Sequence, residues 1–244
     1  MLMYGKTPMG YAKDAGITKE EAEEVFEKYF KSKPKIKEAI ERAQQEAERT
    51  AGIRIPASGF IRKLGNVNSN QYSKQQQAMR QSFNTVIQGS SAFLTQKALI
   101  ALDEFLRDSD INADIIMTVH DSITLSVAHD DVAHAIKEAK YIMEHVPLPM
   151  LHIEHNGEQI LFPMEVSADV GATYGYEFEY DEEDFLSFKS TKGFTEYYKL
   201  IKKAEDMADA KKITKEQLSA MLERLGEMKN QYQHMSWQSS FFVL

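Results

Sequence analysis

The chain has 244 residues and a net charge of −8, with 43% hydrophobic and 27% charged residues, which is the balance of an ordinary folded protein. It has no cysteine, which excludes disulfides, a thiol nucleophile and a thiolate-held zinc ion. The sequence lacks both a run of about 18 apolar residues and the apolar core of a signal peptide, so we expect a reducing, cytoplasmic setting and no membrane partner.

The first part of the chain predicts helices. Residues 18–21 form a capping box, and apolar residues at helical spacing continue to about residue 30. Pro34 breaks or restarts the helix, which then runs to about Thr50. Glycine, proline, asparagine and serine in residues 51–72 indicate loops and short strands.

Apolar residues at helical spacing predict a long helix over residues 74–107, with the apolar stripe interrupted at 88–90. Arg80, Asn84 and Gln88 recur every four residues on it, so they share one face. Amide and guanidinium groups on one face can donate to minor-groove acceptors and phosphates without selecting a sequence. A solvated polar stripe is the alternative, but the apolar neighbours of these residues disfavour it.

A β-hairpin is the most informative element. The strand-forming runs 115–119 and 123–127 are separated only by residues 120–122. Asp121 in such a turn is held rigidly and projects outward. Mg²⁺ binds carboxylates of this kind through one or two contacts, with substrate phosphates completing its coordination. Aspartate is also a favoured turn residue for local hydrogen bonding, which is the competing explanation.

The rest of the chain predicts helices and further strands, and its last apolar residues should dock on another surface. The expected elements are a helix capped by Asp130 or Asp131, a proline-containing connection over 146–157, a strand pair over 159–169, helices over 194–207 and 214–232, and an apolar tail over 241–244.

Charge is segregated along the chain. Residues 28–80 hold 12 Lys and Arg against 4 Asp and Glu, whereas residues 103–184 hold 3 against 20. A basic segment can track phosphates, and an acidic one can concentrate divalent cations. Two differently solvated surfaces explain the same counts, so charge permits a nucleic-acid partner without requiring one.

Five segments, taken together over residues 3–176, resemble in order and spacing the C-terminal part of the family A DNA polymerases, which include bacterial DNA polymerase I and phage replicases. The segments are residues 4–11 (end of motif B), 59–63 (basic loop after the fingers), 80–92 (helix from fingers to palm), 115–121 (palm motif C) and 164–171 (closing palm strand).

This resemblance implies an α+β fold with an antiparallel palm sheet. Residues 1–75 would be the remainder of the helical fingers, 76–180 the palm, and 181–244 a helical C-terminal extension. The implied activity is that of a DNA-directed DNA polymerase, which transfers a nucleotide from a dNTP to a primer 3′-hydroxyl with two Mg²⁺ ions. The implied partners are primer–template DNA and dNTP.

The resemblance also assigns roles to residues of this sequence. It makes Asp121 a metal ligand and places His120 near the primer terminus, so both count as catalytic. The remaining assignments are nucleic-acid contacts by Arg62, Lys63, Arg80, Asn84 and Gln88, and nucleotide contacts by Tyr4 and Gly5.

Two departures from the family pattern affect these assignments. Ser122 stands where the family usually has Glu. Motif A, with the partner aspartate, and the first part of motif B do not occur in this sequence. We therefore expect the chain to be inactive alone and to need an N-terminal polymerase chain carrying motif A, as in a split or interrupted phage gene expressed in bacterial host cytoplasm; a truncated sequence would look the same.

Two other classes of function compete with this one. A non-catalytic DNA-binding or polymerase-accessory fragment would keep the scaffold without the chemistry, which Ser122 and the missing motif A favour. A helical interaction module would require the ordered matches to be coincidental.

Overall fold

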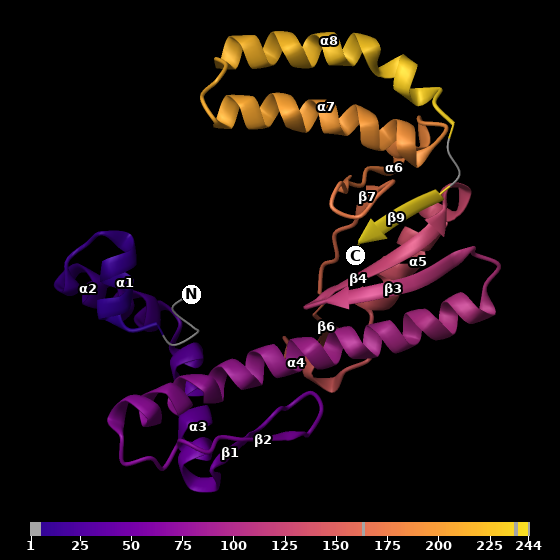
Figure 1. Cartoon of the computed structure of the whole chain (residues 1–244). Coiled ribbons are helices and arrows are strands. Elements are labelled where there is room, and N and C mark those ends of the chain that lie inside the picture. Colours follow the sequence, from indigo (N-terminus) through magenta and orange to yellow (C-terminus); the bar gives the residue numbers. More distant parts are fainter. Residues whose placement is uncertain (1–5, 163, 237–238, 244) are drawn as a thin grey trace. The chain divides into compact units, whose positions relative to one another are not determined.

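The computed structural model describes residues 6–162, 164–236 and 239–243, and it has the mixed α+β architecture expected from the sequence (Figure 1). The chain divides into two compact units. Unit 1 comprises Met1–Leu94 with Leu148–Met150, and unit 2 comprises Thr95–Pro147 with Leu151–Leu244. The division of function among residues 1–75, 76–180 and 181–244 remains a prediction.

Unit 1 is mainly helical, and local sequence signals set its helix ends. Thr18 and Glu21 form the predicted capping box, in which the Thr18 amide donates to Glu21 Oε2 at 2.8 Å and the Glu21 amide to Thr18 Oγ1 at 3.2 Å. Its elements are α1 (Pro8–Ala15), α2 (Lys19–Ser32), α3 (Pro34–Thr50), β1 (Gly52–Arg54), β2 (Ile61–Lys63) and the first part of α4 (Tyr72–Asp108).

The core of unit 1 lies where α3, the β1–β2 hairpin and α4 meet. The two strands pair antiparallel, with Ile53 opposite Arg62. Ile53 is buried, whereas β2 is exposed along its length, so the hairpin presents the basic pair on β2 to solvent. The buried core residues are Ala43, Ala47, Ile53, Leu64, Val67, Ala78, Met79 and Phe83.

Helix α4 is continuous over 37 residues, so the interrupted apolar stripe at 88–90 does not end it. Gly89 explains that interruption. A Cβ on Gly89 would lie 2.5 Å from Cδ1 and 2.9 Å from Cγ1 of Ile55, closer than non-bonded carbon atoms can approach. The missing side chain therefore lets the residue after β1 pack directly on the helix.

Unit 2 contains a five-stranded antiparallel sheet in the order β3-β4-β9-β7-β8. Its elements are β3 (Ala113–Val119), β4 (Ser122–Ala128), a 3₁₀ turn (His129–Asp131), α5 (Val132–Glu144), β5 (His152–His155), β6 (Glu158–Leu161), β7 (Asp169–Gly171), β8 (Phe178–Glu179), α6 (Glu182–Leu186), α7 (Thr191–Asp209), α8 (Lys215–Gln233) and β9 (Ser239–Val243); a further 3₁₀ turn, Pro149–Leu151, crosses from unit 1 into unit 2.

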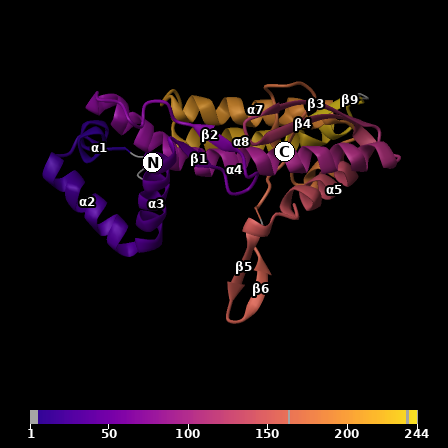
Figure 2. The ribbon, with the colours of Figure 1, turned by 90° about the horizontal axis from the view of Figure 1, so that it is seen from below.

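Two sequence-based expectations were wrong here. Residues 146–157 are not all connection, and 159–169 is not a strand pair: β5 pairs with β6 in a separate two-stranded hairpin (Figure 2). The turn between them is Asn156-Gly157, with φ of 53° and 83°. Asn-Gly favours the positive φ values of a two-residue hairpin turn, so the signal was in the sequence. Strand β7 pairs instead with β8 and β9.

The two predicted C-terminal helices are confirmed as α7 and α8, which lie side by side (Figure 1). Thr214 and Gln217 form a second capping box at the start of α8. At the other end of α8, the carbonyl oxygen of Tyr232 lies so close to Gly193 that a Cβ there would be 2.2 Å away. None of the helices in the described residues is long and apolar enough to cross a membrane.

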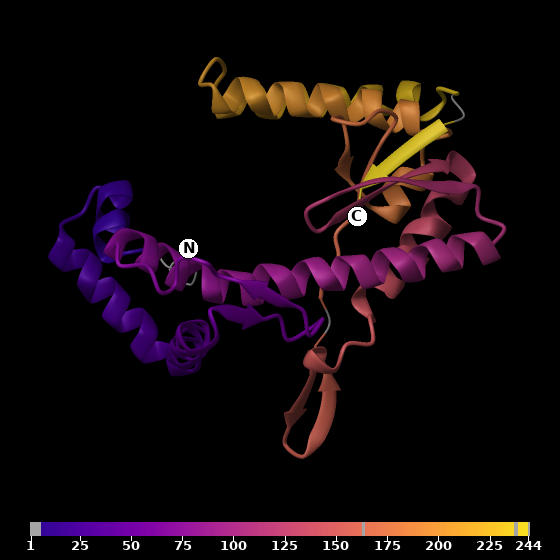
Figure 3. The ribbon, with the colours of Figure 1, turned by 60° about the horizontal axis from the view of Figure 1, so that its bottom comes forward.

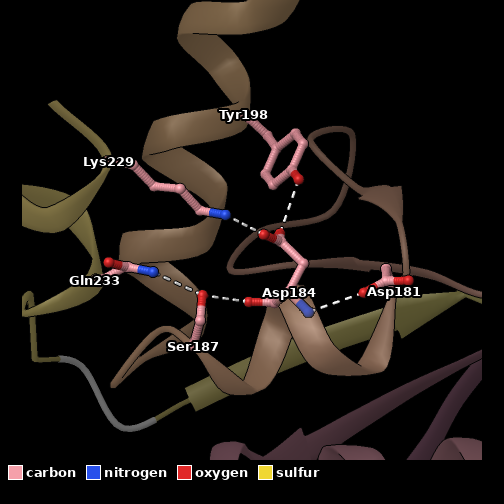
Figure 4. Close-up of polar contacts among 6 residues, drawn as sticks. All are labelled: Asp181, Asp184, Ser187, Tyr198, Lys229 and Gln233. Carbon is pink, nitrogen blue, oxygen red and sulfur yellow. Dashed lines mark hydrogen bonds and ion pairs between the residues drawn. The ribbon is translucent and has the colours of Figure 1, made fainter. Parts of the chain in front are cut away.

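A polar cluster joins α6 to both long helices (Figure 4). The Asp184 carboxylate forms an ion pair with Lys229 of α8 and accepts a 2.8 Å hydrogen bond from the Tyr198 hydroxyl of α7. Burial, and then this hydrogen bond, raise the pKa of Tyr198 above its ordinary range. Ser187 extends the cluster by accepting from Gln233 Nε2 at 2.8 Å.

Aromatic side chains form the core beneath this cluster. Among the side chains that the structure describes, Phe185, Phe188 and Phe194 are the largest that are fully buried. The Phe194 ring centroid lies 5.3 Å from that of Phe185 and 5.6 Å from that of Phe188. His129, directly after β4, packs on Phe185 with ring centroids 5.1 Å apart. The C-terminal helices are therefore part of the folded core of unit 2.

The sequence predicted that the apolar tail docks on another surface, and the backbone pairing of residues 241–243 confirms this prediction. Strand β9 pairs with β4 on one side and with β7 on the other (Figure 3). The last described residues of the chain thus form the middle strand of the sheet.

Candidate active site

The hairpin carrying Asp121 has a turn of only two residues. Val119 pairs with Ser122, so His120 and Asp121 alone connect the strands. His120 has φ of 57°, a left-handed conformation that is uncommon for residues with a Cβ but in which His is enriched several-fold, as are Asn and Asp. The Asp121 side chain is exposed. The turn therefore presents the carboxylate to solvent on a short, tightly connected backbone.

Strands β3 and β4 hold this turn firmly. Strand β4 is buried on both faces, with Ile123, Thr124 and Leu125 buried in succession. Ile116 forms a β-bulge in β3, since Ile115 pairs with Leu125 and Met117 with Thr124. Bulges occur often beside active sites, where they redirect neighbouring side chains.

Ser122 closes the turn. Its hydroxyl donates to the Val119 carbonyl oxygen at 2.8 Å. A serine at this position thus stabilises the backbone that orients Asp121, although it lacks the negative charge of glutamate.

The donor set fits part of a Mg²⁺ site. Mg²⁺ prefers oxygen ligands and is commonly held by one or two carboxylates, with water and substrate phosphates supplying the rest. Asp121 offers one such carboxylate. In the described ranges 6–162, 164–236 and 239–243, no three His, Asp or Glu side chains are grouped closely enough to hold a metal ion. A complete Mg²⁺ site would need further oxygen ligands beside this carboxylate.

The polar face of α4 lies within unit 1. Arg80 and Asn84 are half-buried and Gln88 is exposed, at the four-residue spacing that places them on one side of the helix. Arg62 of β2 is held against the same helix, because its Nη1 donates to Thr85 Oγ1 at 3.1 Å. Thr85 in turn donates to the Gln81 carbonyl oxygen at 2.7 Å.

The structure therefore brings Arg62 to α4 beside the predicted DNA-contacting residues. Lys63 follows it on the exposed strand. The sequence-based reasoning did not single out two residues that join the β1–β2 region to α4. Thr85 accepts the hydrogen bond from Arg62, and Gly89 leaves room for Ile55. These two residues are four apart on α4 and therefore share one face, which was the sequence signal that could have identified them.

The sequence-predicted residues fall into separate groups. His120 and Asp121 belong to unit 2, and Arg62, Lys63, Arg80, Asn84 and Gln88 belong to unit 1. Tyr4 and Gly5, the predicted nucleotide contacts, lie outside the described residues.

Two titratable groups elsewhere in unit 2 are perturbed by packing. Burial lowers the pKa of His129, against the opposing effect of Asp130, and its Nδ1 lies 2.9 Å from Thr191 Oγ1. Partial burial, and then the charges of Glu179 and Glu177, raise the pKa of Asp169 above 3.8. Asp169 and Glu179 are direct cross-strand partners, which explains their repulsion.

Comparison with known proteins gives consistent matches. The sequence pattern described as DNA polymerase family A matches residues 1–176. The chain is 32% identical over 217 residues to the DNA polymerase of Bacillus phage SP01, covering 87% of this chain and 23% of that protein. It is 31% identical over 143 residues to DNA polymerase I of Geobacillus stearothermophilus, covering 59% of this chain and 16% of that protein.

A solved structure is also similar. It is the POL domain of Pol1 from M. smegmatis in complex with DNA primer-template and dNTP. The TM-score is 0.57 at 25% sequence identity, covering 60% of this chain and 26% of that one. The chain thus spans about a quarter or less of the length of these relatives.

Proposed function

The chain belongs to the family A DNA polymerases, and from this premise we propose that it supplies one part of a nucleotidyl-transfer active site. Asp121 is the metal-binding carboxylate of that part. The observation that carries the proposal is its position, exposed at a two-residue hairpin turn inside the matched region 1–176. The reaction joins the 3′-hydroxyl of a DNA primer to the α-phosphate of a dNTP and releases pyrophosphate.

Each group of residues has a separate task in this proposal. Asp121 holds one side of the metal-binding position, and the neighbouring His120 lies at the primer terminus. Gln88 and Asn84 contact the minor-groove edge of the primer–template, and the Arg80 guanidinium contacts phosphate. When bound, Mg²⁺ supplies charge stabilisation at the transferred phosphoryl group and lowers the pKa of the attacking hydroxyl.

Arg62 and Lys63 extend the DNA contact along β2. Arg62 is held in place by Thr85, so its remaining guanidinium N–H groups can donate to a phosphate. The exposed Lys63 adds a second cation. Such contacts give affinity without sequence selection, as a template-directed polymerase requires.

The finer proposal is that activity needs a second polypeptide segment carrying another carboxylate. One carboxylate does not complete a two-metal site, and the described residues offer no clustered alternative. We expect this chain alone to extend no primer, whereas a polymerase portion that carries motif A should restore activity.

A covalent chimera tests the proposal directly. Residues 1–244 of this chain would replace the corresponding C-terminal region of the Bacillus phage SP01 DNA polymerase, and Mg²⁺-dependent primer extension would be measured. We expect an active chimera whose rate falls at least a hundredfold with Asp121→Ala. Asp114→Ala, which removes another exposed carboxylate of the same hairpin, is the matched control and should leave the rate within about twofold.

The outcomes separate the competing functions. Equal extension by the Asp121→Ala chimera and its parent would show that Asp121 is not a catalytic ligand. A chimera that binds primer–template DNA but does not extend it would favour the non-catalytic DNA-binding alternative.

A further inference from the structure

The turn that follows β7 exposes two aromatic side chains. The Tyr176 amide donates to the Thr173 carbonyl oxygen at 3.2 Å, and Gly175 between them has φ of 89°. A positive φ at the third residue of a β-turn favours glycine, which fits this position. Tyr174 is 61% exposed and Tyr176 is 56% exposed. The turn thus presents two tyrosine rings to solvent.

The backbone of this turn is held at both ends. The Ala172 amide donates to Thr195 Oγ1 of α7 at 2.8 Å. A Cβ on Gly171 would lie 2.2 Å from the Tyr176 carbonyl oxygen, so the missing side chain lets the last residue of β7 pack directly against the end of the turn. The two exposed rings therefore stand on a backbone that is already in place before any ligand binds.

Helix α7 places three lysines beside the turn. The Lys199 Nζ lies 4.4 Å from the centroid of the Tyr176 ring, which is a cation–π contact. Lys199 also forms a 2.9 Å ion pair with Glu196, so its ammonium group is held from two directions. Lys202 and Lys203 are exposed, and they follow Lys199 by three and four residues, which puts them on the same side of the helix.

The turn and these lysines line one pocket of about 450 Å³ in unit 2. Its charged lining consists of the three lysines against two carboxylates, Glu177 and Asp206. The pocket between α5 and residues 180–182 has the opposite excess, with two lysines against four carboxylates. A basic lining in a chain whose net charge is −8 favours an anionic ligand.

Both carboxylates of the pocket already have partners within the protein. Glu177 Oε1 accepts a 2.7 Å hydrogen bond from the Gly175 amide. Asp206 pairs with Lys202 at 3.2 Å, but both side chains are 62% exposed, and such surface pairs contribute little free energy. Lys202 can therefore turn to an incoming phosphate at small cost.

Exposed aromatic rings beside lysines are the features by which proteins bind single-stranded nucleic acid. Bases stack on aromatic rings whatever their sequence, and the cations follow the phosphate backbone. Lys199 lies over the Tyr176 ring, and the exposure of that residue leaves ring surface for a base. In a duplex the bases are stacked on one another, so an unpaired strand is the form of DNA that can use this ring.

We propose that Tyr174, Tyr176, Lys199, Lys202 and Lys203 form a binding site for single-stranded DNA, the tyrosine–lysine site. A base stacks on Tyr176, and the ammonium groups of Lys202 and Lys203 contact neighbouring phosphates. The identity of the strand, the unpaired part of a primer–template, rests on the proposed function. Because α7 lies outside residues 1–176, the segment after the family match would add its own contact to DNA.

Binding of a labelled strand to the full chain tests the aromatic contact. The probe is fluorescein-labelled oligothymidine of about 12 nucleotides, followed by fluorescence anisotropy. We expect Tyr176→Ala to weaken binding at least about fivefold, and Tyr176→Phe, which keeps the ring, to stay within about twofold. Tyr141→Ala removes an equally exposed tyrosine of unit 2 and is the matched control. Equal binding by Tyr176→Ala and the unmodified chain would overturn the proposal.

The salt dependence of the same binding tests the lysines. Lys202→Ala with Lys203→Ala removes two phosphate contacts, so the slope of log affinity against log salt concentration should become shallower by about 1.4, or about 0.7 for each contact. Lys211→Ala with Lys212→Ala removes the same charge from exposed positions after α7 and should change the slope by less than half as much. An unchanged slope for the first pair would overturn the phosphate contacts.

Competition identifies the class of ligand. Unlabelled oligothymidine should displace the labelled strand, whereas poly-glutamate at the same concentration of negative charge should not. Equally effective displacement by poly-glutamate would assign the site to an acidic polypeptide and overturn the proposal.

The outcomes also separate this site from the proposed function. Weakened binding by Tyr176→Ala, combined with a chimera that Asp121→Ala does not affect, would contradict the proposed function and support the tyrosine–lysine site. Unchanged binding by Tyr176→Ala, combined with a chimera that depends on Asp121, would contradict the tyrosine–lysine site alone.

Discussion

Residues 1–176 and residues 177–244 differ in the side chains that they expose. The first segment presents Asp121, Gln88 and Lys63 to solvent on a turn, a helix and a short strand. The second buries Phe185 and Phe194 completely and encloses charged groups in a bonded cluster. The segment that matches the polymerase family carries these exposed residues of the candidate site. The segment after it supplies the larger part of the aromatic core of unit 2.

This difference shows that the C-terminal segment stabilises the sheet that carries the candidate active site. His129, one residue after β4, contacts Phe185 and Thr191, so the two segments share one core. Substitutions at buried positions of the second segment should therefore lower stability, whereas substitution of Asp121 in the first segment should lower activity. The predictions that follow test this division.

The largest stability loss is expected for Phe194→Ala. The ring is completely buried and contacts Phe185, Phe188 and Tyr198, so truncation leaves a cavity and should cost about 3–5 kcal/mol. Urea unfolding monitored by far-UV circular dichroism measures it. Tyr174→Ala, at a position that is 61% exposed, is the control and should cost less than about 0.5 kcal/mol. A loss below about 1 kcal/mol for Phe194→Ala would contradict the shared core.

Asp184→Ala should have the next largest effect. It leaves the Lys229 ammonium and the Tyr198 hydroxyl without their shared acceptor in a partly buried setting, at a cost of about 1–3 kcal/mol. A double variant with Lys229→Ala should lose less than the sum of the two single losses, because both changes remove one ion pair. Additive losses in the unfolding experiment would mean that the two residues act independently.

Gly89→Ala should destabilise unit 1 by about 1–3 kcal/mol, because the added methyl group overlaps Ile55. Gly226→Ala is the matched control. It also replaces a helical glycine, but no atom lies within 4 Å of its added Cβ, so stability should rise by about 0.5–1 kcal/mol. Thermal unfolding of both variants gives the signs. A stabilised Gly89→Ala variant would show that the β1–β2 hairpin does not pack on α4 as described.

The smallest effect concerns Asp169, where substitution should stabilise. Asp169→Asn removes repulsion from its cross-strand partner Glu179 and should add about 0.5 kcal/mol near pH 7. Because folding raises the pKa of Asp169, the wild-type carboxyl gains a proton more readily when folded, so its penalty disappears as the pH falls toward 3.8. The gain from Asp169→Asn should therefore shrink over the same range. Urea unfolding at pH 7 and pH 4 checks this, and an equal gain at both would refute it.

Short-range signals made much of the fold predictable. Thr18 with Glu21 and Thr214 with Gln217 mark helix starts by side-chain hydrogen bonds to nearby amides. The alternating hairpin strands around Asp121 were equally clear. The β5–β6 hairpin was missed although Asn156-Gly157 signals it, because each strand is only four residues long and has a single β-branched residue, Ile153 or Ile160.

Long-range pairing was not predictable in the same way. The tail over 241–244 could be recognised as apolar, but the pairing of β9 with β4 depends on a partner more than 100 residues earlier in the chain. The candidate site shows the same limit. Asp121 and the α4 face followed from local patterns, whereas the hydrogen bond from Arg62 to Thr85 joins separate elements and needed the structure.

The two-residue turn at His120 and Asp121 also restricts how this hairpin can change in evolution. One inserted residue would shift the carboxylate by up to about 3.3 Å, the rise of one strand residue. In the proposed site, Asp121 binds Mg²⁺ through a metal–oxygen bond of only about 2.1 Å, so this shift exceeds what that coordination tolerates. Under the proposed function, we therefore expect insertions and deletions between Val119 and Ser122 to be eliminated by selection.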